Sequence, residues 1–364
     1  MSVAVDRKAE RTRDAAIALV DGDIHPNPKS VKALGRYMPA RWRRHHETFG
    51  PRGHGGAYYP RANDNAARTD SWPPSGDPPG SDLPFLREQL VDAWHIDVGV
   101  LNALGPAAGL QRNLEYSAAL ASAMNEWLQA EWLDPEPRLR ASMIVPGEAG
   151  DLAAAEIRRR AAQPGFVQVL LHVRTAEPLG RRRYWPMYEA AVEHDMPIGL
   201  HFGGAGGSPI TGAGWPSFYI EDHAGMPVAF QSQVLSLVAE GVFERFPTLK
   251  IVLIEGGFGW LAPLMWRLDN AYRWLREEVP HLRRPPSEYI REHFWLTTQP
   301  MEEPERAEHF HALLGHLGMD DRLMFATDYP HWDFDAPDQA IPARLEPDLE
   351  AAIMAGNACR LYRL

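Results

Sequence analysis

The sequence predicts an α/β protein, a (β/α)8 barrel distorted by long insertions after its first and fifth strands. Eight short apolar runs alternate with stretches of helical length, an order typical of βα units around a parallel sheet. A single barrel needs about 250 residues and accepts insertions, so 364 residues suit one enlarged domain. The runs cover residues 17–24, 98–102, 140–145, 167–171, 198–200, 250–254, 294–297 and 323–326.

Helices are predicted between the apolar runs. Residues 114–128, 184–194 and 259–275 carry apolar side chains at spacings of three and four, which places them on one face of a helix. Eight strands with helices between them favour a closed barrel over an open, doubly wound sheet. We therefore expect a single domain over residues 17–364, preceded by a flexible lead at residues 1–16.

Two segments interrupt this order. Residues 36–84 follow the first strand and are dense in Gly and Pro, so we expect a loop without secondary structure. In a barrel it would lie over the C-terminal ends of the strands, where active sites are found. Loops of this length are functional lids or disordered linkers, and the aromatic content (Tyr58, Tyr59, Trp72) favours a lid. Residues 203–225 follow the fifth strand and would flank the same end.

Composition excludes several classes of partner. The formal net charge is −11 and no basic stripe is present, which argues against nucleic acid and anionic membranes. The sequence has no apolar run of about 18 residues and no apolar segment near Met1 that resembles a secretory signal. A single cysteine, Cys359, permits neither an internal disulfide nor a thiolate metal cage. These features fit a cytoplasmic protein that acts on a small molecule.

Polar residues end the first strand in the sequence Asp21-Gly22-Asp23-Ile24-His25. Because side chains alternate along a strand, Asp21, Asp23 and His25 share one face. Three ionisable groups facing an apolar barrel interior would be costly to bury unless they bind an ion. The alternative is a strand-end turn with solvated acids.

Four more strands end in a similar residue: His172, His201, Glu255 and Asp328. Each has a structural explanation when taken singly, as a hydrogen-bonding histidine or a capping carboxylate. Imidazole or carboxylate groups at the same end of five strands are hard to ascribe to chance. Oxygen and nitrogen ligands of this kind suit zinc or manganese.

The motifs together resemble the amidohydrolase superfamily, in the branch that contains aminocarboxymuconate-semialdehyde decarboxylase. The family's first strand typically carries Asp-x-His-x-His, and Asp21 to His25 stand there. His201 matches the metal-binding His after strand five, and Asp328 in Thr-Asp-Tyr-Pro-His matches the metal-binding Asp of strand eight. Residues 246–251 and 356–358 also look like this branch. The resemblance covers residues 17–364.

The resemblance implies one divalent metal ion held by Asp23, His25, His201 and Asp328. Zn²⁺ is the first expectation, with Mn²⁺ or Fe²⁺ as alternatives, and a homodimer is implied as well. Two residues depart from the family pattern. Asp23 stands where the family has His or Glu, and Glu255 stands where decarboxylases of this branch carry a catalytic His. His172 occupies the place of the bridging lysine of binuclear members, which favours a single metal.

The leading functional prediction is hydrolysis of a carbonyl-type bond by metal-activated water. Asp328 would accept a proton from the water, Glu255 would act as a second acid or base, and His172 and His331 would bind substrate or stabilise developing charge. The second prediction is a non-oxidative decarboxylase, or a carbon–carbon bond hydrolase or hydratase, acting on a ring-derived carboxylic acid. The third is a barrel without catalytic activity that serves as a binding protein.

Overall fold

The computed structural model describes residues 17–51, 66–106, 108–204 and 209–364. The predicted flexible lead at residues 1–16 lies outside this range, as do Tyr58 and Tyr59 of the predicted lid.

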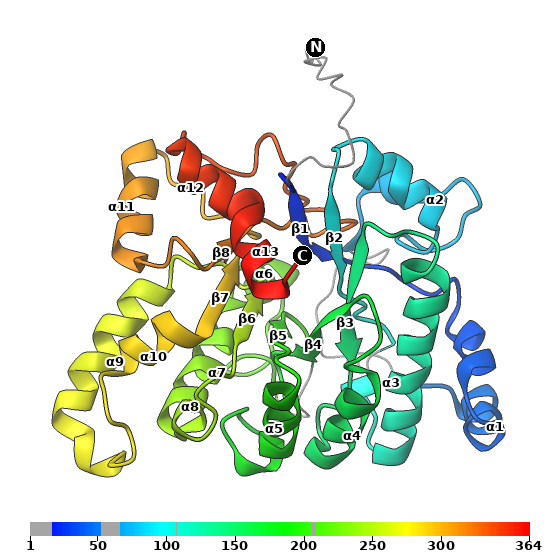
Figure 1. The fold of residues 1–364 in the computed structure, drawn as a ribbon, viewed down its shortest axis with the longest axis horizontal. Helices are drawn as coiled ribbons and strands as arrows, with labels where there is room; N and C mark the ends of the chain where they lie inside the picture. Colours follow the sequence, from blue (N-terminus) through cyan, green and yellow to red (C-terminus); the bar gives the residue numbers. More distant parts are fainter. Residues whose placement is uncertain (1–16, 52–65, 107, 205–208) are drawn as a thin grey trace.

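Eight parallel strands form one sheet in chain order, β1 to β8, and the sheet is nearly closed into a barrel (Figure 1). The amide of Gly22 in β1 donates to the carbonyl of Phe325 after β8 over 2.9 Å, which links the first strand to the last. The predicted barrel is confirmed. The strands are β1 (Val20–Ile24), β2 (Val98–Leu101), β3 (Leu139–Ile144), β4 (Phe166–His172), β5 (Ile198–His201), β6 (Ile251–Ile254), β7 (Phe294–Thr297) and β8 (Leu323–Met324).

Helices connect the strands and surround them (Figure 1). The predicted helix over residues 114–128 has those bounds, and the two other predicted helices agree to within two residues at each end. The α-helices are α1 (Ala40–Phe49), α2 (Leu83–Leu86), α3 (Leu114–Leu128), α4 (Gly150–Arg160), α5 (Trp185–Glu193), α6 (Tyr219–Ala224), α7 (Pro227–Ala239), α8 (Val242–Arg245), α9 (Leu261–Leu275), α10 (Pro286–His293), α11 (Ala307–Leu317), α12 (Pro347–Ala351) and α13 (Asn357–Tyr362). Shorter 3-10 segments are η1 (Val31–Tyr37), η3 (Thr69–Ser71), η5 (Ala108–Leu110), η7 (Arg182–Tyr184) and η8 (Arg276–Glu278), and π-helical segments are η4 (Arg87–Asp92), η6 (Gln129–Leu133) and η9 (Ala352–Gly356).

The core lies between the barrel and its helices. Strands that are covered on both faces have continuous apolar sequences, because neither face is exposed to water. All four residues of β6, Ile251 to Ile254, are buried, and so are those of β5. Helix α3 is capped by Asn113, whose side chain accepts a hydrogen bond from the Tyr116 amide, and the helix buries Leu120 and Leu128 against the barrel.

The first insertion is not without secondary structure, so that part of the prediction is wrong. Helix α1 lies at the outer edge of the molecule beside α3 (Figure 1), where His46 Nδ1 and the Tyr116 hydroxyl are 2.6 Å apart. Apolar contact between Trp42 and Tyr116 supplies the packing that overrides the Gly and Pro content of the segment. Further along, Ala67 forms an antiparallel bridge with His331 and so reaches the mouth of the barrel, the end at which the strands terminate.

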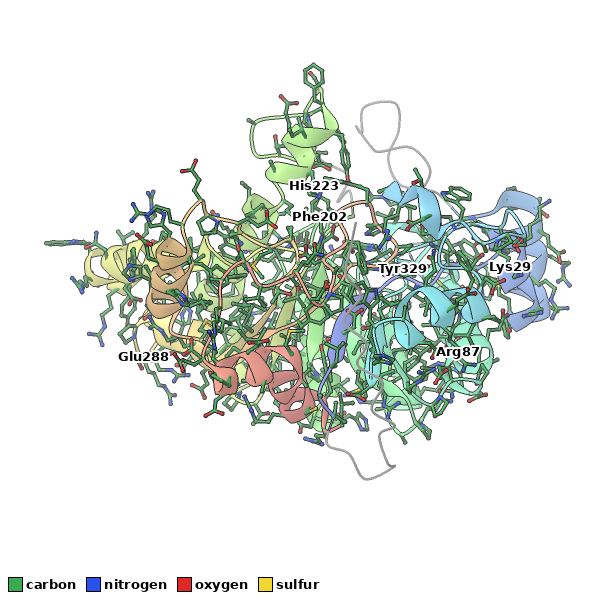
Figure 2. The ribbon with its side chains drawn as sticks, turned by 90° about the horizontal axis from the view of Figure 1, so that it is seen from above. Lys29, Arg87, Phe202, His223, Glu288 and Tyr329 are labelled. Atoms are coloured by element: carbon green, nitrogen blue, oxygen red, sulfur yellow. The ribbon has the colours of Figure 1, made fainter. Side chains whose placement is uncertain are left out.

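The second insertion carries α6. Figure 2 shows this segment projecting beyond the rest of the molecule, with His223 at its base. Its side chains meet the loop that follows β8, since His223 Nε2 lies 2.9 Å from Asp333 Oδ2. The insertion therefore flanks the mouth, as predicted. None of the helices in the described part of the chain has the length and apolar character needed to cross a membrane.

Candidate metal centre

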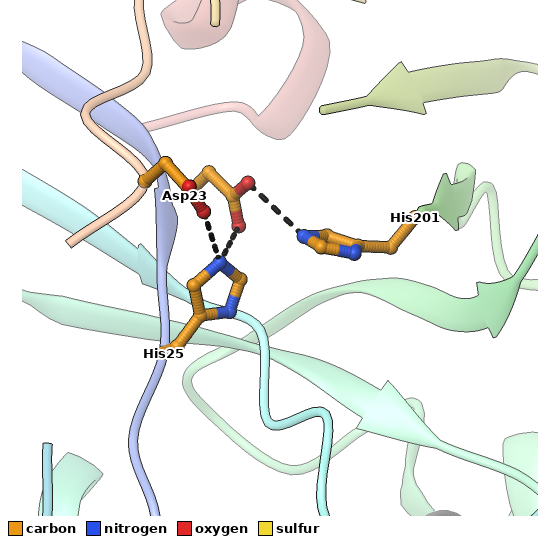
Figure 3. A group of neighbouring side chains, drawn as sticks. Asp23, His25 and His201 are labelled. Carbon is orange, nitrogen blue, oxygen red and sulfur yellow. Dashed lines mark hydrogen bonds and ion pairs between the residues drawn. The ribbon is translucent and has the colours of Figure 1, made fainter. Parts of the chain in front are cut away.

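Four of the predicted residues gather at the mouth of the barrel. Asp23, His25, His201 and Asp328 are all buried, and one ligand atom from each lies within 4.8 Å of the others. Figure 3 shows His25 from β1 and His201 from β5 pointing at the carboxylate of Asp23. His201 Nε2 is 3.2 Å from Asp23 Oδ2, and His25 Nε2 is 3.3 Å from Asp23 Oδ1 and 2.7 Å from Asp328 Oδ1.

The ring orientation of both histidines suits a metal ion. His25 Nδ1 donates to the carbonyl of Asn102 over 2.7 Å, and His201 Nδ1 donates to the carbonyl of Phe202 over 2.8 Å. A carbonyl oxygen only accepts, so the proton of each neutral ring belongs on Nδ1 and the lone pair of Nε2 faces the cluster. Ligating histidines are held in this way, with the second nitrogen bonded to a carbonyl or carboxylate.

The charges of the cluster favour a cation between the carboxylates. Burial opposes ionisation of Asp23, yet His25 and His201 hold its pKa well below the usual range. Burial likewise opposes protonation of His25, but Asp23 and Asp328 raise its pKa well above 6.5. The carboxylates of Asp23 and Asp328 therefore place negative charge at a point where a proton on His25 or a divalent cation bound in its place would be stabilised. The donor set fits one such ion.

Glu255 is a fifth ionisable group at the same place. It is 6% exposed, and its Oε2 lies 3.3 Å from His201 Nδ1. Burial raises the pKa of Glu255 well above 4.5, and the nearby charges of Asp328 and Asp23 raise it further. A carboxyl group in this environment holds its proton more strongly than an exposed glutamate does.

Both Glu255 and Asp328 have left-handed backbone conformations, with φ of 56° and 62°. Residues other than glycine rarely adopt this region, and each such residue costs about 1–3 kcal/mol. Strained residues of this kind cluster at active sites, where the surrounding structure holds them in place. The strain therefore supports a functional role for these two side chains.

The other two predicted residues differ in their placement. His331 joins the site: its Nδ1 lies 2.8 Å from Asp328 Oδ1, and its ring stacks on that of His25 with centroids 4.5 Å apart. His172, at the end of β4, packs against Gly203 and Gly204. It belongs to neither of the ligand clusters found among the described residues.

Several residues that contact the cluster were not singled out from the sequence. Asn102 donates to Asp23 Oδ1 over 2.8 Å. Gln299 lies between Asp328 and Asp333, with its Nε2 3.3 Å from Asp328 Oδ2 and 2.9 Å from Asp333 Oδ2. Asn102 and Gln299 follow the ends of β2 and β7, so the strand-end criterion that identified Asp23 would have found them had amides been counted.

Aromatic side chains flank the mouth. The ring of Trp332 lies 5.1 Å from that of His223, and its Nε1 donates to the Tyr219 hydroxyl over 3.4 Å. Burial raises the pKa of Tyr219 to about 12, and the charges of Glu255, Asp333 and Asp328 contribute to the shift. A pocket of about 540 Å³ opens beside the same loop. It is lined by Arg68, Asp70, Gln89, Trp94, Tyr329, Trp332, Phe334, Ala336 and Gln339.

A barrel with nitrogen and oxygen ligands gathered at the ends of its strands defines a class, the mononuclear metal-dependent barrel enzymes. Within that class the chain belongs to the amidohydrolase family, whose model matches residues 20–364. The family resemblance predicted from the motifs is confirmed.

Curated relatives are decarboxylases. A gamma-resorcylate decarboxylase from Polaromonas sp. (strain JS666) is 28% identical over 299 residues, which cover 78% of this chain and 88% of the relative. A second gamma-resorcylate decarboxylase, from Rhodococcus jostii (strain RHA1), is 28% identical over 269 residues, covering 68% of this chain and 78% of the relative.

Solved structures share the fold. The 5-carboxyvanillate decarboxylase of Sphingomonas paucimobilis superposes with a TM-score of 0.71 at 22% identity, covering 96% of this chain and all of that one. The dihydroxybenzoic acid decarboxylase of Polaromonas sp. JS666, solved with bound manganese and the inhibitor 2-nitroresorcinol, has a TM-score of 0.68 at 22% identity, covering 96% and 98%. The two gamma-resorcylate decarboxylases among the curated relatives favour the second functional prediction, decarboxylation, over the leading prediction of hydrolysis.

Proposed function

We propose that this protein is a metal-dependent, non-oxidative decarboxylase of a small aromatic carboxylic acid. The observation that carries the proposal is the buried cluster of Asp23, His25, His201 and Asp328 with the carboxyl group of Glu255 beside it. Its support comes from the curated relatives, gamma-resorcylate decarboxylases that align over most of the chain.

Asp23, His25, His201 and Asp328 would hold the ion. When bound, the ion supplies a Lewis acid that binds and polarises an oxygen atom of the substrate. Two carboxylates and two imidazoles suit Mn²⁺ as well as Zn²⁺. Because manganese is bound in a decarboxylase of the same fold, we propose Mn²⁺ in place of the Zn²⁺ first expected.

Glu255 would supply the proton. Loss of carbon dioxide from an aromatic acid leaves the electron pair of the broken bond on the ring carbon, and a C–H bond must form there. The required group is an acid that keeps its proton near neutral pH. Glu255 is buried among carboxylates, where the protonated form is favoured. It would thus take the role that a histidine has in decarboxylases of this branch.

The remaining groups at the mouth would bind and orient the substrate. His331 contacts Asp328 and lies at the edge of the cluster, where an anionic substituent of the ring would meet a hydrogen-bond donor. Tyr219, His223 and Trp332 form a group of aromatic rings at the mouth, in which Tyr219 lies near the charges of Glu255 and Asp328, and such rings stack on a planar substrate. An aromatic acid suits both features.

Hydrolysis of a carbonyl-type bond is the second candidate. The observation that favours it is Glu255 itself, because a protonated glutamate in place of the histidine of decarboxylases can serve as the acid toward the leaving group. Asp328 and Glu255 would then share the proton transfers. A binding protein without catalytic activity is the third candidate, and retention of the whole ligand set argues against it. Homodimer formation and a cytoplasmic location remain predictions.

The test begins with the protein purified without added metal, with elemental analysis of the wild type and of His201→Ala. We expect about one divalent ion per chain, lost in the variant. The loaded enzyme is then given gamma-resorcylate, 5-carboxyvanillate and related hydroxybenzoates in deuterium oxide. Release of carbon dioxide with one deuterium at the vacated ring carbon supports the proposal. Turnover of esters, lactones or amides, with no carbon dioxide from any acid, would replace it with hydrolysis.

Glu255→Gln separates proton donation from metal binding. We expect carbon dioxide release to fall by about 100-fold or more, the range of general acid catalysis, with the metal content unchanged. The matched control is Glu156→Gln, which alters a buried glutamate on α4 that bonds to Arg159 and Arg160 and belongs to neither ligand cluster among the described residues. Full activity in Glu255→Gln would assign the proton to another group.

A further inference from the structure

A chain of buried polar side chains crosses the interior of the barrel and ends on the carboxylate of Asp23. It begins at the hydroxyl of Tyr362 in α13, which donates to Gln168 Oε1 over 3.0 Å. Gln168 Nε2 donates to Ser142 Oγ over 2.8 Å, and the Ser142 hydroxyl donates to Asn102 Oδ1. Asn102 Nδ2 completes the chain by donating to Asp23 Oδ1 over 2.8 Å.

All four hydrogen bonds point in one direction, toward Asp23. The side-chain amides are fully used, because Asn102 Nδ2 also donates to the carbonyl of Gly22 and Gln168 Nε2 also approaches Asn102 Oδ1 at 3.4 Å. Each amide orientation is thus fixed by its neighbours. Hydrogen bonds in such a series polarise one another, and a chain that is satisfied throughout is rigid.

The interior of a barrel does not need these residues for packing. Bulky branched apolar side chains usually fill it, whereas Asn102, Ser142 and Gln168 are polar and all 0% exposed. The neighbouring strand makes room for the chain at Gly199, where an added Cβ would lie 3.2 Å from Gln168 Cδ and 2.8 Å from Ile254 Cδ1. Filling space alone therefore does not explain this buried polar network.

Asn102 contacts two of the four ligands at once. Its side chain holds Asp23 Oδ1, which leaves Oδ2 facing His201, and its backbone carbonyl accepts from His25 Nδ1. The side chain of Asn102 thus holds Asp23, which stands where the family has His or Glu and has a shorter side chain than either. One residue therefore sets the orientation of both ligands supplied by β1.

We propose that the Tyr362–Gln168–Ser142–Asn102 chain is the positioning element for Asp23 and His25, and that it raises the affinity of the cluster for its divalent ion. It acts on the reaction only through these ligands. The inference rests on the metal centre proposed above. Residues that orient ligands in this way typically change metal affinity by about 10- to 100-fold when removed.

The experiment measures the dissociation constant of Mn²⁺ and of Zn²⁺ for the metal-free protein by competition with a chelator. Ser142→Ala removes one hydroxyl from the middle of the chain, and Tyr362→Phe removes one from its far end. We expect affinity to fall by about tenfold in Ser142→Ala and by a smaller, measurable factor in Tyr362→Phe. Asn102→Ala should have the largest effect, near the upper end of that range.

The chain offers matched controls. Ser117→Ala and Tyr188→Phe delete equally buried hydroxyls whose hydrogen bonds run to the backbone carbonyls of Ala108 and Leu179, away from the cluster. A role in stability alone would lower the melting temperature of both sets and leave metal affinity unchanged in both. Affinity that falls only in the chain variants supports the proposal.

Two results overturn it. Unchanged affinity in Ser142→Ala and Tyr362→Phe rejects the positioning chain while leaving the metal centre intact. Absence of divalent metal binding in the wild-type protein rejects both. If Asn102→Ala does not fold, the two hydroxyl deletions still decide the question, because each removes a single oxygen atom.

Discussion

Two pairs of residues at the metal centre, Asp23 with His25 and Asp328 with Glu255, are held in place by different means. Asp23 and His25 lie at the end of β1 and are fixed by hydrogen bonds with Asn102, which donates to Asp23 and accepts from His25. Asp328 and Glu255 lie just beyond the ends of β8 and β6, where the backbone takes the left-handed conformation. Hydrogen bonds with a buried polar residue hold Asp23 and His25, whereas Asp328 and Glu255 are held in strained backbone conformations.

The difference bears on what each pair can do. A strand-borne ligand keeps its direction without distortion, which suits residues whose task is to hold an ion. A turn with positive φ can direct a side chain where no strand residue points, which suits a group that must reach the substrate. We therefore expect Asp23 and His25 to determine metal affinity and Glu255 to determine the rate of the chemical step, while Asp328 contributes to both.

The largest expected effect is that of Asp328→Asn. The substitution keeps the shape of the side chain but removes the charge that faces His25 and His331. Because Asp328 would ligate the ion directly, metal affinity should fall by more than the roughly 100-fold limit seen for residues that only support a ligand. Chelator competition measures it, and Asp338→Asn, an exposed change in the same loop, is the control. Retained affinity would remove Asp328 from the ligand set.

The loop after β8 also predicts a pH dependence of stability. Burial raises the pKa of Asp335 from 3.8 to about 7, helped by the charges of Asp333 and Glu303. Between about pH 4 and pH 7, the Asp335 carboxyl group therefore keeps its proton in the folded protein but has lost it in the unfolded chain. The associated stability is fully present below about pH 4 and disappears as the pH rises through 7.

Asp335→Asn should abolish this loss of stability at higher pH. The amide is neutral at every pH, so the variant should gain stability relative to wild type as the pH rises from about 4 to 7 and then hold a constant advantage. Urea unfolding at a series of pH values, at fixed metal concentration, measures the difference. Asp348→Asn on the exposed face of α12 is the control. A difference that does not vary with pH would contradict the assignment.

Backbone strain at Glu255 is tested by comparing two substitutions. Glycine adopts positive φ freely whereas alanine does not, so Glu255→Gly should be more stable than Glu255→Ala by about 1 kcal/mol. His95, with φ of 53° on the surface, is the matched position, and its Gly and Ala variants should differ by a similar amount. Thermal or urea unfolding gives both differences. Equal stability of the Gly and Ala variants at Glu255 would show that no strain is stored there.

The strand-borne part of the site could be predicted from the sequence. Alternation along a strand places Asp23 and His25 on one face, and parallel strands bring the ends of β1, β5 and β8 together. The strained conformation of Glu255 could not be foreseen, because it depends on tertiary contacts such as the hydrogen bond from its amide to Thr297. Glu255 was singled out as a strand-end carboxylate, but its neighbours in the sequence did not predict the positive φ.

The position of the second insertion at the mouth was predicted, but the side chains that it contributes there could not be, for the same reason. Tyr219 and His223 reach the mouth only because α6 packs on the loop after β8, and that contact joins residues more than 100 positions apart. His172 also satisfies the strand-end criterion and packs against Gly203 and Gly204. Its predicted role in binding substrate stays a prediction.

The smallest expected effect belongs to the rim, and it distinguishes substrate binding from metal binding. Tyr219→Ala removes an aromatic face beside Trp332, and loss of one aromatic contact costs about 0.5–1.5 kcal/mol. KM for an aromatic acid should therefore rise by up to about tenfold, with metal affinity unchanged. Tyr219→Phe keeps the ring and should retain most of the binding, which separates the ring from its hydroxyl. If Tyr219→Ala lowered metal affinity instead, α6 would influence the metal ligands. The rim could then no longer be described as binding substrate alone, with metal binding confined to the strand ends.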